Sequence, residues 1–110
     1  MNLQKLSEIF ESILPGRVFH YIAGTKSDQY ILWAEDGQAD SMHGDNHMQE
    51  QTLSGTLDLY TKTEFDPLFD QVQDAMNRSG IPWRLESVQY EEETEYIHYE
   101  WSWEVLNKIG

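Results

Sequence analysis

Residues 94–105 read Thr-Glu-Tyr-Ile-His-Tyr-Glu-Trp-Ser-Trp-Glu-Val, and this run decides the fold. Large apolar side chains alternate with polar ones, at the period of two that a β-strand imposes. The apolar members are Ile97, Tyr99, Trp101, Trp103 and Val105. The polar members are His98, Glu100, Ser102 and Glu104. Such strict alternation predicts a strand with one buried face and one acidic face.

A second β-patterned run, starting at Trp83, leads into this strand through an acidic turn. The turn contains Glu91, Glu92 and Glu93. Runs of like charge are usually solvated, so we interpret the turn as a surface loop. Residues 83–105 therefore predict two long neighbouring strands.

Two helices are predicted, one at the start of the chain and one before these strands. Across residues 3–14 the apolar side chains recur at three- and four-residue steps, and Pro15 ends the pattern. The second helix follows Asp66, which suits an N-cap before a first-turn proline, and Gly80 suits its C-terminal end. We expect Phe65 to staple its first turn.

Three further strands are expected in the first half of the chain. Residues 18–23 and 29–34 are β-rich and predict a hairpin around the turn at 24–28. Residues 52–61 predict another strand, in which Gly55 marks a bulge or a close approach of two backbones. Residues 36–51 are polar and lack periodicity, so they predict a long loop of a kind that often carries function.

The element order α-β-β-β-α-β-β predicts an α+β fold. We expect a mostly antiparallel sheet of about five strands with two helices packed on one face. The length of 110 residues suits a single domain over residues 1–110, interrupted by the long polar loop at about 36–51.

Composition excludes several classes of function. The formal net charge is −13, and the seven Lys and Arg residues are scattered, so sequence-specific nucleic-acid binding is not expected. Cysteine is absent, which excludes disulfides, thiolate zinc sites and a cysteine nucleophile. Neither a signal-peptide core nor a membrane span is recognisable, and we expect a soluble cytoplasmic protein without membrane contact.

No motif predicts an enzyme or a cofactor. A phosphate-binding Gly-rich loop, a nucleophile elbow and a His-Glu-x-x-His motif are all missing from the sequence. The long loop does hold His43, Asp45 and His47, and two imidazoles four residues apart would share one face of a helix and could bind a metal. An ordinary polar loop is the interpretation we prefer, because Gly44 and the lack of an apolar stripe argue against a helix there. We interpret His20 and His98 as ordinary residues of the sheet surface.

The four tryptophans admit two interpretations. Stacking platforms for single-stranded nucleic acid also need a cationic groove, and these tryptophans lie among glutamates. We expect core packing for most of them, and an oligomer interface for any that are exposed. Trp33 is the one we include among the interface candidates.

The order of elements resembles that of the tail-completion, tail-terminator and head–tail joining proteins of long-tailed bacteriophages and prophages. The features that carry the resemblance are the leading helix at 3–14, the β-run ending Leu57-Asp-Leu-Tyr60, the helix at 65–76 and the closing run from Tyr90 through its acidic turn. These features span most of the chain.

The resemblance implies a non-enzymatic assembly protein. Members of that family form rings, commonly hexameric, that cap the tail tube or join it to the head, and several are monomers until they reach their target. It implies self-association, partners in the tail tube or neck, and a place first in the bacterial host cytoplasm and then in the virion tail or neck. We expect ring contacts from the second helix, the predicted hairpin and the long loop. The interface candidates are Trp33, Asp40, His43, Asp45, His47, Asp70, Asp74, Glu91, Glu92 and Glu93.

Two other classes remain open. In a DNA-mimic inhibitor, carboxylates imitate backbone phosphates and occupy a basic nucleic-acid site on another protein; acids in two phosphate-like rows would favour it. A metal-dependent enzyme built on His43 and His47 ranks third, and it would require stoichiometric metal.

Overall fold

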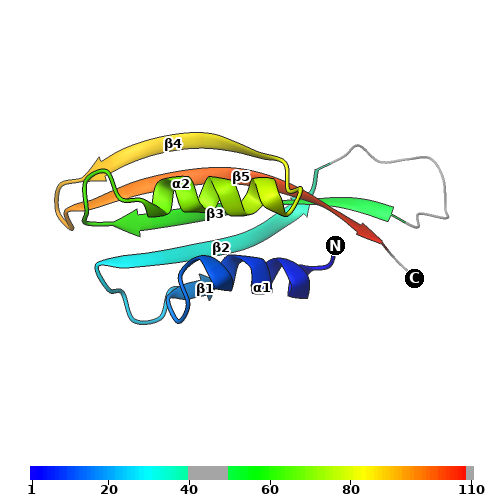
Figure 1. The fold of residues 1–110 in the computed structure, drawn as a ribbon, viewed down its shortest axis with the longest axis horizontal. Coiled ribbons are helices and arrows are strands. Elements are labelled where there is room, and N and C mark those ends of the chain that lie inside the picture. Colours follow the sequence, from blue (N-terminus) through cyan, green and yellow to red (C-terminus); the bar gives the residue numbers. More distant parts are fainter. Residues whose placement is uncertain (40–49, 109–110) are drawn as a thin grey trace.

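The computed structural model describes residues 1–39 and 50–108, and it confirms the predicted α+β fold and element order. The elements are α1 (Leu3–Ile13), β1 (Val18–His20), β2 (Gln29–Gln38), β3 (Glu50–Thr61), α2 (Leu68–Arg78), β4 (Trp83–Glu91) and β5 (Tyr96–Lys108). The strands form one sheet in the order β1-β2-β3-β5-β4. Both helices cover the same face of this sheet, as expected (Figure 1).

The strongest sequence signal forms the centre of the sheet. β5 pairs antiparallel with β3 on one side and with β4 on the other. The apolar face of its alternation is buried beneath the helices, with Trp101 and Trp103 exposed by 0% and 1%. Phe10 of α1 packs against this layer, its ring centroid 6.1 Å from that of Trp103. The helices are therefore held by the apolar side of the strand that the sequence identified.

The second helix ends as predicted, but its N-cap position is Pro67, one residue after the predicted Asp66, and Phe65 does not staple it. The Oδ1 atom of Asp66 accepts a hydrogen bond from the backbone N–H of Leu68 at 2.9 Å, and Gly80 adopts a left-handed φ of 68°. Phe65 itself has a φ of 58° and is 89% exposed, so the predicted staple is wrong. The left-handed backbone at Phe65 is the local reason that this ring leaves the helix surface.

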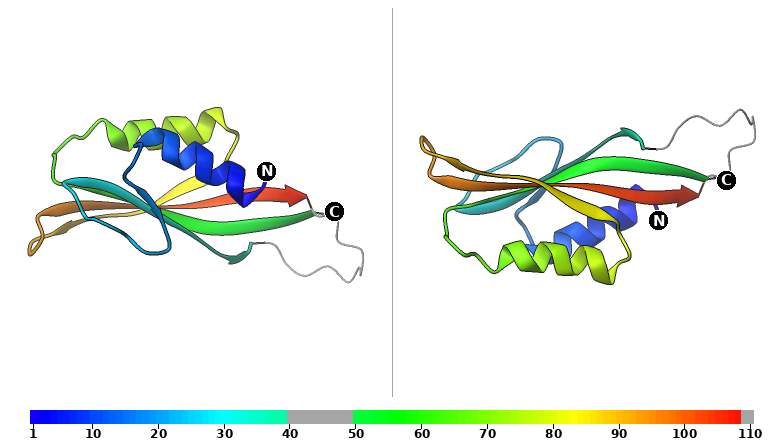
Figure 2. Two further views of the ribbon diagram at one scale, coloured as in Figure 1. Left: turned by 90° about the horizontal axis from the view of Figure 1, so that it is seen from below. Right: turned by 90° about the horizontal axis from the view of Figure 1, so that it is seen from above.

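The predicted hairpin at 18–34 is also wrong, because β1 runs parallel to β2. The backbone N–H of Ile31 donates to the carbonyl of Arg17, and that of Tyr21 donates to the carbonyl of Trp33, both at 2.9 Å. Tyr21 has a φ of 68°, which turns the chain out of β1. Residues 21–28 then cross to the face of the sheet opposite the helices before β2 begins (Figure 2).

The long loop is shorter than predicted. β2 continues through Gln38 and β3 already starts at Glu50, so both ends of the predicted 36–51 segment are strand. A register shift between Glu35 and Gly37 interrupts the alternation of β2, which explains why the pattern was not recognisable. Residues 40–49 lie outside the described part of the chain, and with them Asp40, His43, Asp45 and His47.

Gly55 confirms the predicted close approach. A Cβ atom at this position would lie 2.2 Å from the carbonyl oxygen of Ala34 and 2.3 Å from Cζ2 of Trp103. The register places Gly55 opposite Trp103, whose indole takes the space that a side chain would need.

Neither helix of the described residues has the length and apolar character that crossing a membrane requires.

Candidate functional site

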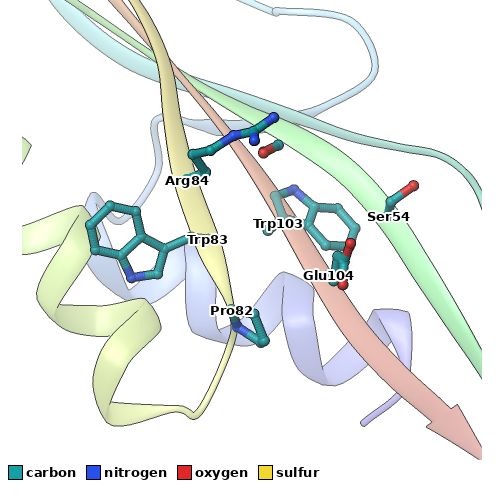
Figure 3. A pocket seen from close by; sticks show the side chains of 7 residues that line it. Ser54, Pro82, Trp83, Arg84, Trp103 and Glu104 are labelled. Carbon is teal, nitrogen blue, oxygen red and sulfur yellow. The ribbon is translucent and has the colours of Figure 1, made fainter. Parts of the chain in front are cut away.

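The pockets of the described residues offer little for catalysis. One hollow of about 320 Å³ lies where β4 begins, between Trp83, Arg84 and Trp103 (Figure 3). The Arg84 guanidinium is bonded to the Glu86 carboxylate at 3.0 to 3.2 Å, and the Ser102 hydroxyl donates to the same carboxylate at 2.8 Å. Arg84 and Ser102 are thus both engaged with Glu86, and the described residues around this hollow form no nucleophile–base pair.

The sheet has one open edge at β4, which among the strands of the described residues pairs with β5 alone. Val88 and Tyr90 of this strand are 52% and 62% exposed. Together with Ile97 they line a shallow hollow of about 730 Å³, and we call these three residues the β4 patch. The exposed Phe65 follows Glu64, which lines the same hollow. An unpaired strand beside exposed apolar side chains is a surface suited to association.

The opposite edge is built differently. β1 covers only Ile31–Trp33 of β2, so the outer edge of β2 beyond Trp33 pairs with no strand among the described residues. Tyr21 and Ile22, just after β1, are 56% and 82% exposed. The two edges of the sheet therefore differ in length and sequence, and each carries exposed apolar side chains.

Charge also differs between the two ends of the strand order. Arg17 precedes β1 and Lys26 lies on the loop after it, and both are exposed. The acidic Asp28 and Asp36 are exposed at the same end. The turn after β4 carries the exposed Glu92, Glu93 and Glu95. The prediction that the acidic turn is a solvated surface loop is thereby confirmed for Glu92 and Glu93, whereas Glu91 is half-buried.

On the face opposite the helices, His98 of β5 lies between carboxylates of three strands. Its Nε2 is 2.7 Å from Oδ1 of Asp58 and its Nδ1 is 3.7 Å from Oε2 of Glu91. The hydrogen bond with Asp58 raises the pKa of His98; partial burial opposes this, and the charges of Asp58, Glu91 and Glu100 add to it. His98 is therefore not the ordinary surface residue that we expected.

Tyrosines close one end of this polar face. Tyr60 stacks on the His98 ring at 4.2 Å and on Tyr30 at 4.6 Å. Tyr96 donates its hydroxyl to the carbonyl of Ser27 at 2.6 Å, which ties β5 to the loop after β1. Burial is the main cause that raises the pKa of Tyr30 to about 12. The face opposite the helices is therefore acidic but, at this end, covered.

A second histidine–carboxylate pair lies near the β1 edge. His20 Nε2 is 2.6 Å from Oε1 of Glu35, and the imidazole stacks between Tyr21 at 3.8 Å and Trp33 at 4.0 Å. Burial of Glu35 favours its neutral form and would by itself raise its pKa. The hydrogen bonds from Tyr21 and His20 have the larger combined effect, so the pKa of Glu35 is lowered. The same hydrogen bond to Glu35 raises the pKa of Tyr21.

The predicted interface residues that lie within the described ranges do not form one site. Trp33 is 2% exposed and packs in the core, its ring 5.3 Å from that of Phe10, so it is not available to a partner. Asp70 and Asp74 are exposed on α2, where Asp74 pairs with Arg78 at 3.1 Å. Asp58 escaped prediction, although the alternation of its strand already placed it on the polar face.

Comparison of the sequence with protein-family models and with curated proteins gives no match.

Proposed function

We propose that this protein is a non-enzymatic structural component of a phage or prophage tail, of the tail-completion or head–tail joining type, whose copies associate edge to edge into a ring. The order of helices and strands on which the resemblance rests is the order that the fold has. By the same resemblance its partners are tail-tube or neck proteins, its assembly takes place in the host cytoplasm, and its final place is the virion tail or neck.

The observation that carries the proposal is the pair of unlike open edges. A surface that contacts a different surface on the next copy generates a ring if the rotation closes. The β4 edge offers nine residues of strand, with Val88 and Tyr90 beside it. The other edge offers the uncovered part of β2, with Tyr21 and Ile22 nearby. Strand addition combined with burial of such side chains is an established mode of recognition.

Charge separates the two edges in part. The β1 edge carries the basic Arg17 and Lys26 together with the acidic Asp28 and Asp36, whereas only acids, Glu92, Glu93 and Glu95, accompany the turn at the β4 edge. Complementary charges favour contact between unlike edges and disfavour contact between like ones. A chain with a net charge of −13 also suits a ring that passes DNA, because an acidic wall repels phosphate.

The DNA-mimic reading has weaker support. A mimic needs carboxylates that are free to replace phosphates. Two of the acids on the open face are already engaged, since Asp58 is bonded to His98 and Glu86 to Arg84. We therefore rank the assembly function first.

Light scattering over a concentration series tests the proposal. The wild-type chain is expected to grow toward a ring-sized species, and Val88→Arg is expected to lower the mass at equal concentration. Leu106→Arg is the matched control, because Leu106 is 48% exposed on β5 and lies outside the β4 patch. A concentration-dependent increase in mass that Val88→Arg leaves unchanged, or that Leu106→Arg lowers equally, would contradict edge-to-edge assembly through β4.

A charge swap tests the polarity of the contact. Arg17→Glu, or the pair Glu92→Lys and Glu93→Lys, should each weaken association. All three substitutions in one chain should restore part of it, because position 17 and positions 92–93 then again carry opposite charges, whereas Lys26 and Glu95 keep their original signs. Association that is indifferent to all of these changes would contradict the head-to-tail arrangement.

A further inference from the structure

Three potential metal ligands meet on the face of the sheet opposite the helices. The donor atoms of Asp58, His98 and Glu100 all lie within 4.8 Å of one another. Asp58 comes from β3, and the other two come from β5. Imidazole and carboxylate together are donors typical of zinc and of other first-row transition metals.

The spacing of the donors is close to that of a coordination shell. Bonds of about 2.0–2.2 Å from zinc to nitrogen and oxygen place neighbouring ligands roughly 3–4 Å apart. The His98 Nε2 and Asp58 Oδ1 atoms are 2.7 Å apart. This pair needs to open only slightly for a cation to replace the proton that the two atoms share.

Charge on this face is incompletely balanced. The register sets Asp58 directly opposite Glu100, and like charges at such positions destabilise a sheet. His98 bonds to Asp58, whereas Glu100 forms no side-chain hydrogen bond or ion pair within residues 1–39 and 50–108. A bound dication would neutralise both carboxylates at once.

A separate observation points to a missing partner at the same place. The hydroxyl oxygen of Ser87 is shielded from solvent and lacks a hydrogen-bond partner. The pairing of β4 with β5 sets Ser87 opposite Glu100. Buried hydroxyls are nearly always bonded, and a water or an ion is one of the partners that an orphan hydroxyl can take. A hydrated cation at Glu100 would supply that partner.

The imidazole is also held in place. Tyr60 stacks on it at 4.2 Å, and the side chains of His98 and Asp58 are each only 15% exposed. Glu91 lies 3.7 Å from the ring nitrogen that does not face Asp58. Metal-bound histidines commonly direct their second nitrogen at a carboxylate, which orients the ring.

We propose that Asp58, His98 and Glu100 bind a divalent first-row transition metal, such as Zn²⁺ or Mn²⁺, with water completing its coordination. The bound ion ties β3 to β5 beside the Tyr60 stack. This site goes beyond the proposed assembly function and does not depend on it.

Isothermal titration of the full chain with zinc chloride tests the proposal. The wild-type protein is expected to bind one zinc ion per chain. His98→Gln should abolish this binding, and Glu100→Gln, which leaves the His98–Asp58 hydrogen bond intact, should weaken it by about tenfold or more. Circular dichroism of each variant confirms that it is folded.

Two control variants locate the binding. His20→Gln removes an imidazole whose 2.6 Å carboxylate contact resembles that of His98 but which has a single acidic neighbour, and it should bind zinc like wild type. The double variant His43→Gln, His47→Gln should also bind like wild type. In wild-type protein, substoichiometric Mn²⁺ should broaden the NMR signals of the His98 ring more strongly than those of His20, which lies two strands away from Asp58.

The outcomes are decisive in both directions. Loss of binding in His98→Gln, with retention in both controls, establishes the site. Absence of zinc binding by the wild type overturns the proposal. Binding that survives in folded His98→Gln, or that disappears only in the His43 and His47 double variant, overturns it as well.

Discussion

Substitution of Gly55 by alanine probes the centre of the sheet with a single methyl group. An ideal Cβ atom at this position would lie 2.2 Å from the Ala34 carbonyl oxygen and 2.3 Å from Cζ2 of Trp103. Both distances are far inside van der Waals contact. The obstacles are a strand backbone and an indole that is 1% exposed, so neither can move away freely.

The size of the effect follows from two opposed contributions. The backbone at Gly55 lacks a positive φ, so alanine can adopt its conformation. Because alanine restricts the conformations of the unfolded chain, it would by itself raise the free energy of unfolding by about 0.4–1 kcal/mol. Overpacking of a filled core costs about 1–3 kcal/mol, and more when the neighbours are rigid. At the upper end of this range we expect a net loss of about 2 kcal/mol in the free energy of unfolding, a sizeable share of a typical 5–15 kcal/mol total.

Urea unfolding followed by tryptophan fluorescence measures this loss. Gly24→Ala is a matched control, because its Cβ would meet the Phe19 ring at 2.8 Å, and that half-exposed ring can rotate away at little cost. A double-mutant cycle with Trp103→Phe isolates the indole contribution. Gly55→Ala should cost less in the Trp103→Phe background, although the contact with the Ala34 carbonyl remains.

A neutral or stabilising effect of Gly55→Ala would refute this reasoning. So would equal costs of Gly55→Ala in the wild-type and Trp103→Phe backgrounds, since the indole would then not occupy the space above Gly55. Either result would also call into question the register that pairs Gly55 with Trp103.

Three further predictions concern the core, the helix start and pH. Trp101→Ala, at a position 0% exposed, should cost about 3–5 kcal/mol in urea unfolding, and a loss near zero would place the ring at the surface. Asp66→Ala removes a buried acceptor of three hydrogen bonds and should cost about 3 kcal/mol or more, measured in the same way; full stability would contradict the capping role. The pKa of Glu35 is lowered in the folded state. The ionised Glu35 therefore contributes to the free energy of unfolding above its ordinary pKa of 4.5, and this contribution is lost as the pH falls through the lower pKa of the folded protein. The stability difference between wild type and Glu35→Gln should therefore shrink on acidification, as chemical unfolding at a series of pH values would measure; a constant difference would contradict the shift.

Local patterns predicted much of the fold because they report the geometry of one segment at a time. The alternation from Ile97 to Val105 required a strand with a buried face, whatever it pairs with. Asp66 and Gly80 marked the ends of α2 through hydrogen bonding and a left-handed turn, which are also local. The charge of the acidic turn was sufficient to predict that Glu92 and Glu93 lie in solvent.

Other features depended on which segments meet. The parallel pairing of β1 with β2 is set by the hydrogen bonds from Ile31 to Arg17 and from Tyr21 to Trp33. The turn-like sequence at 24–28 does not show whether the strands that it connects are parallel or antiparallel. The strand character of residues 36–38 depends on pairing with β3 across a bulge. The interface role expected for Trp33 failed because α1 and β5 bury this side chain, which its own strand does not reveal.

The candidate site divides in the same way. The alternation of β5 alone places His98 and Glu100 on the polar face of one strand, because successive residues of a strand point to opposite sides. The folded structure was needed to show that Asp58, forty residues away from His98, lies 2.7 Å from its ring, and that the two edges of the sheet are unlike. Register and strand order arise from contacts between distant segments, and the periodicity of a single segment does not encode them.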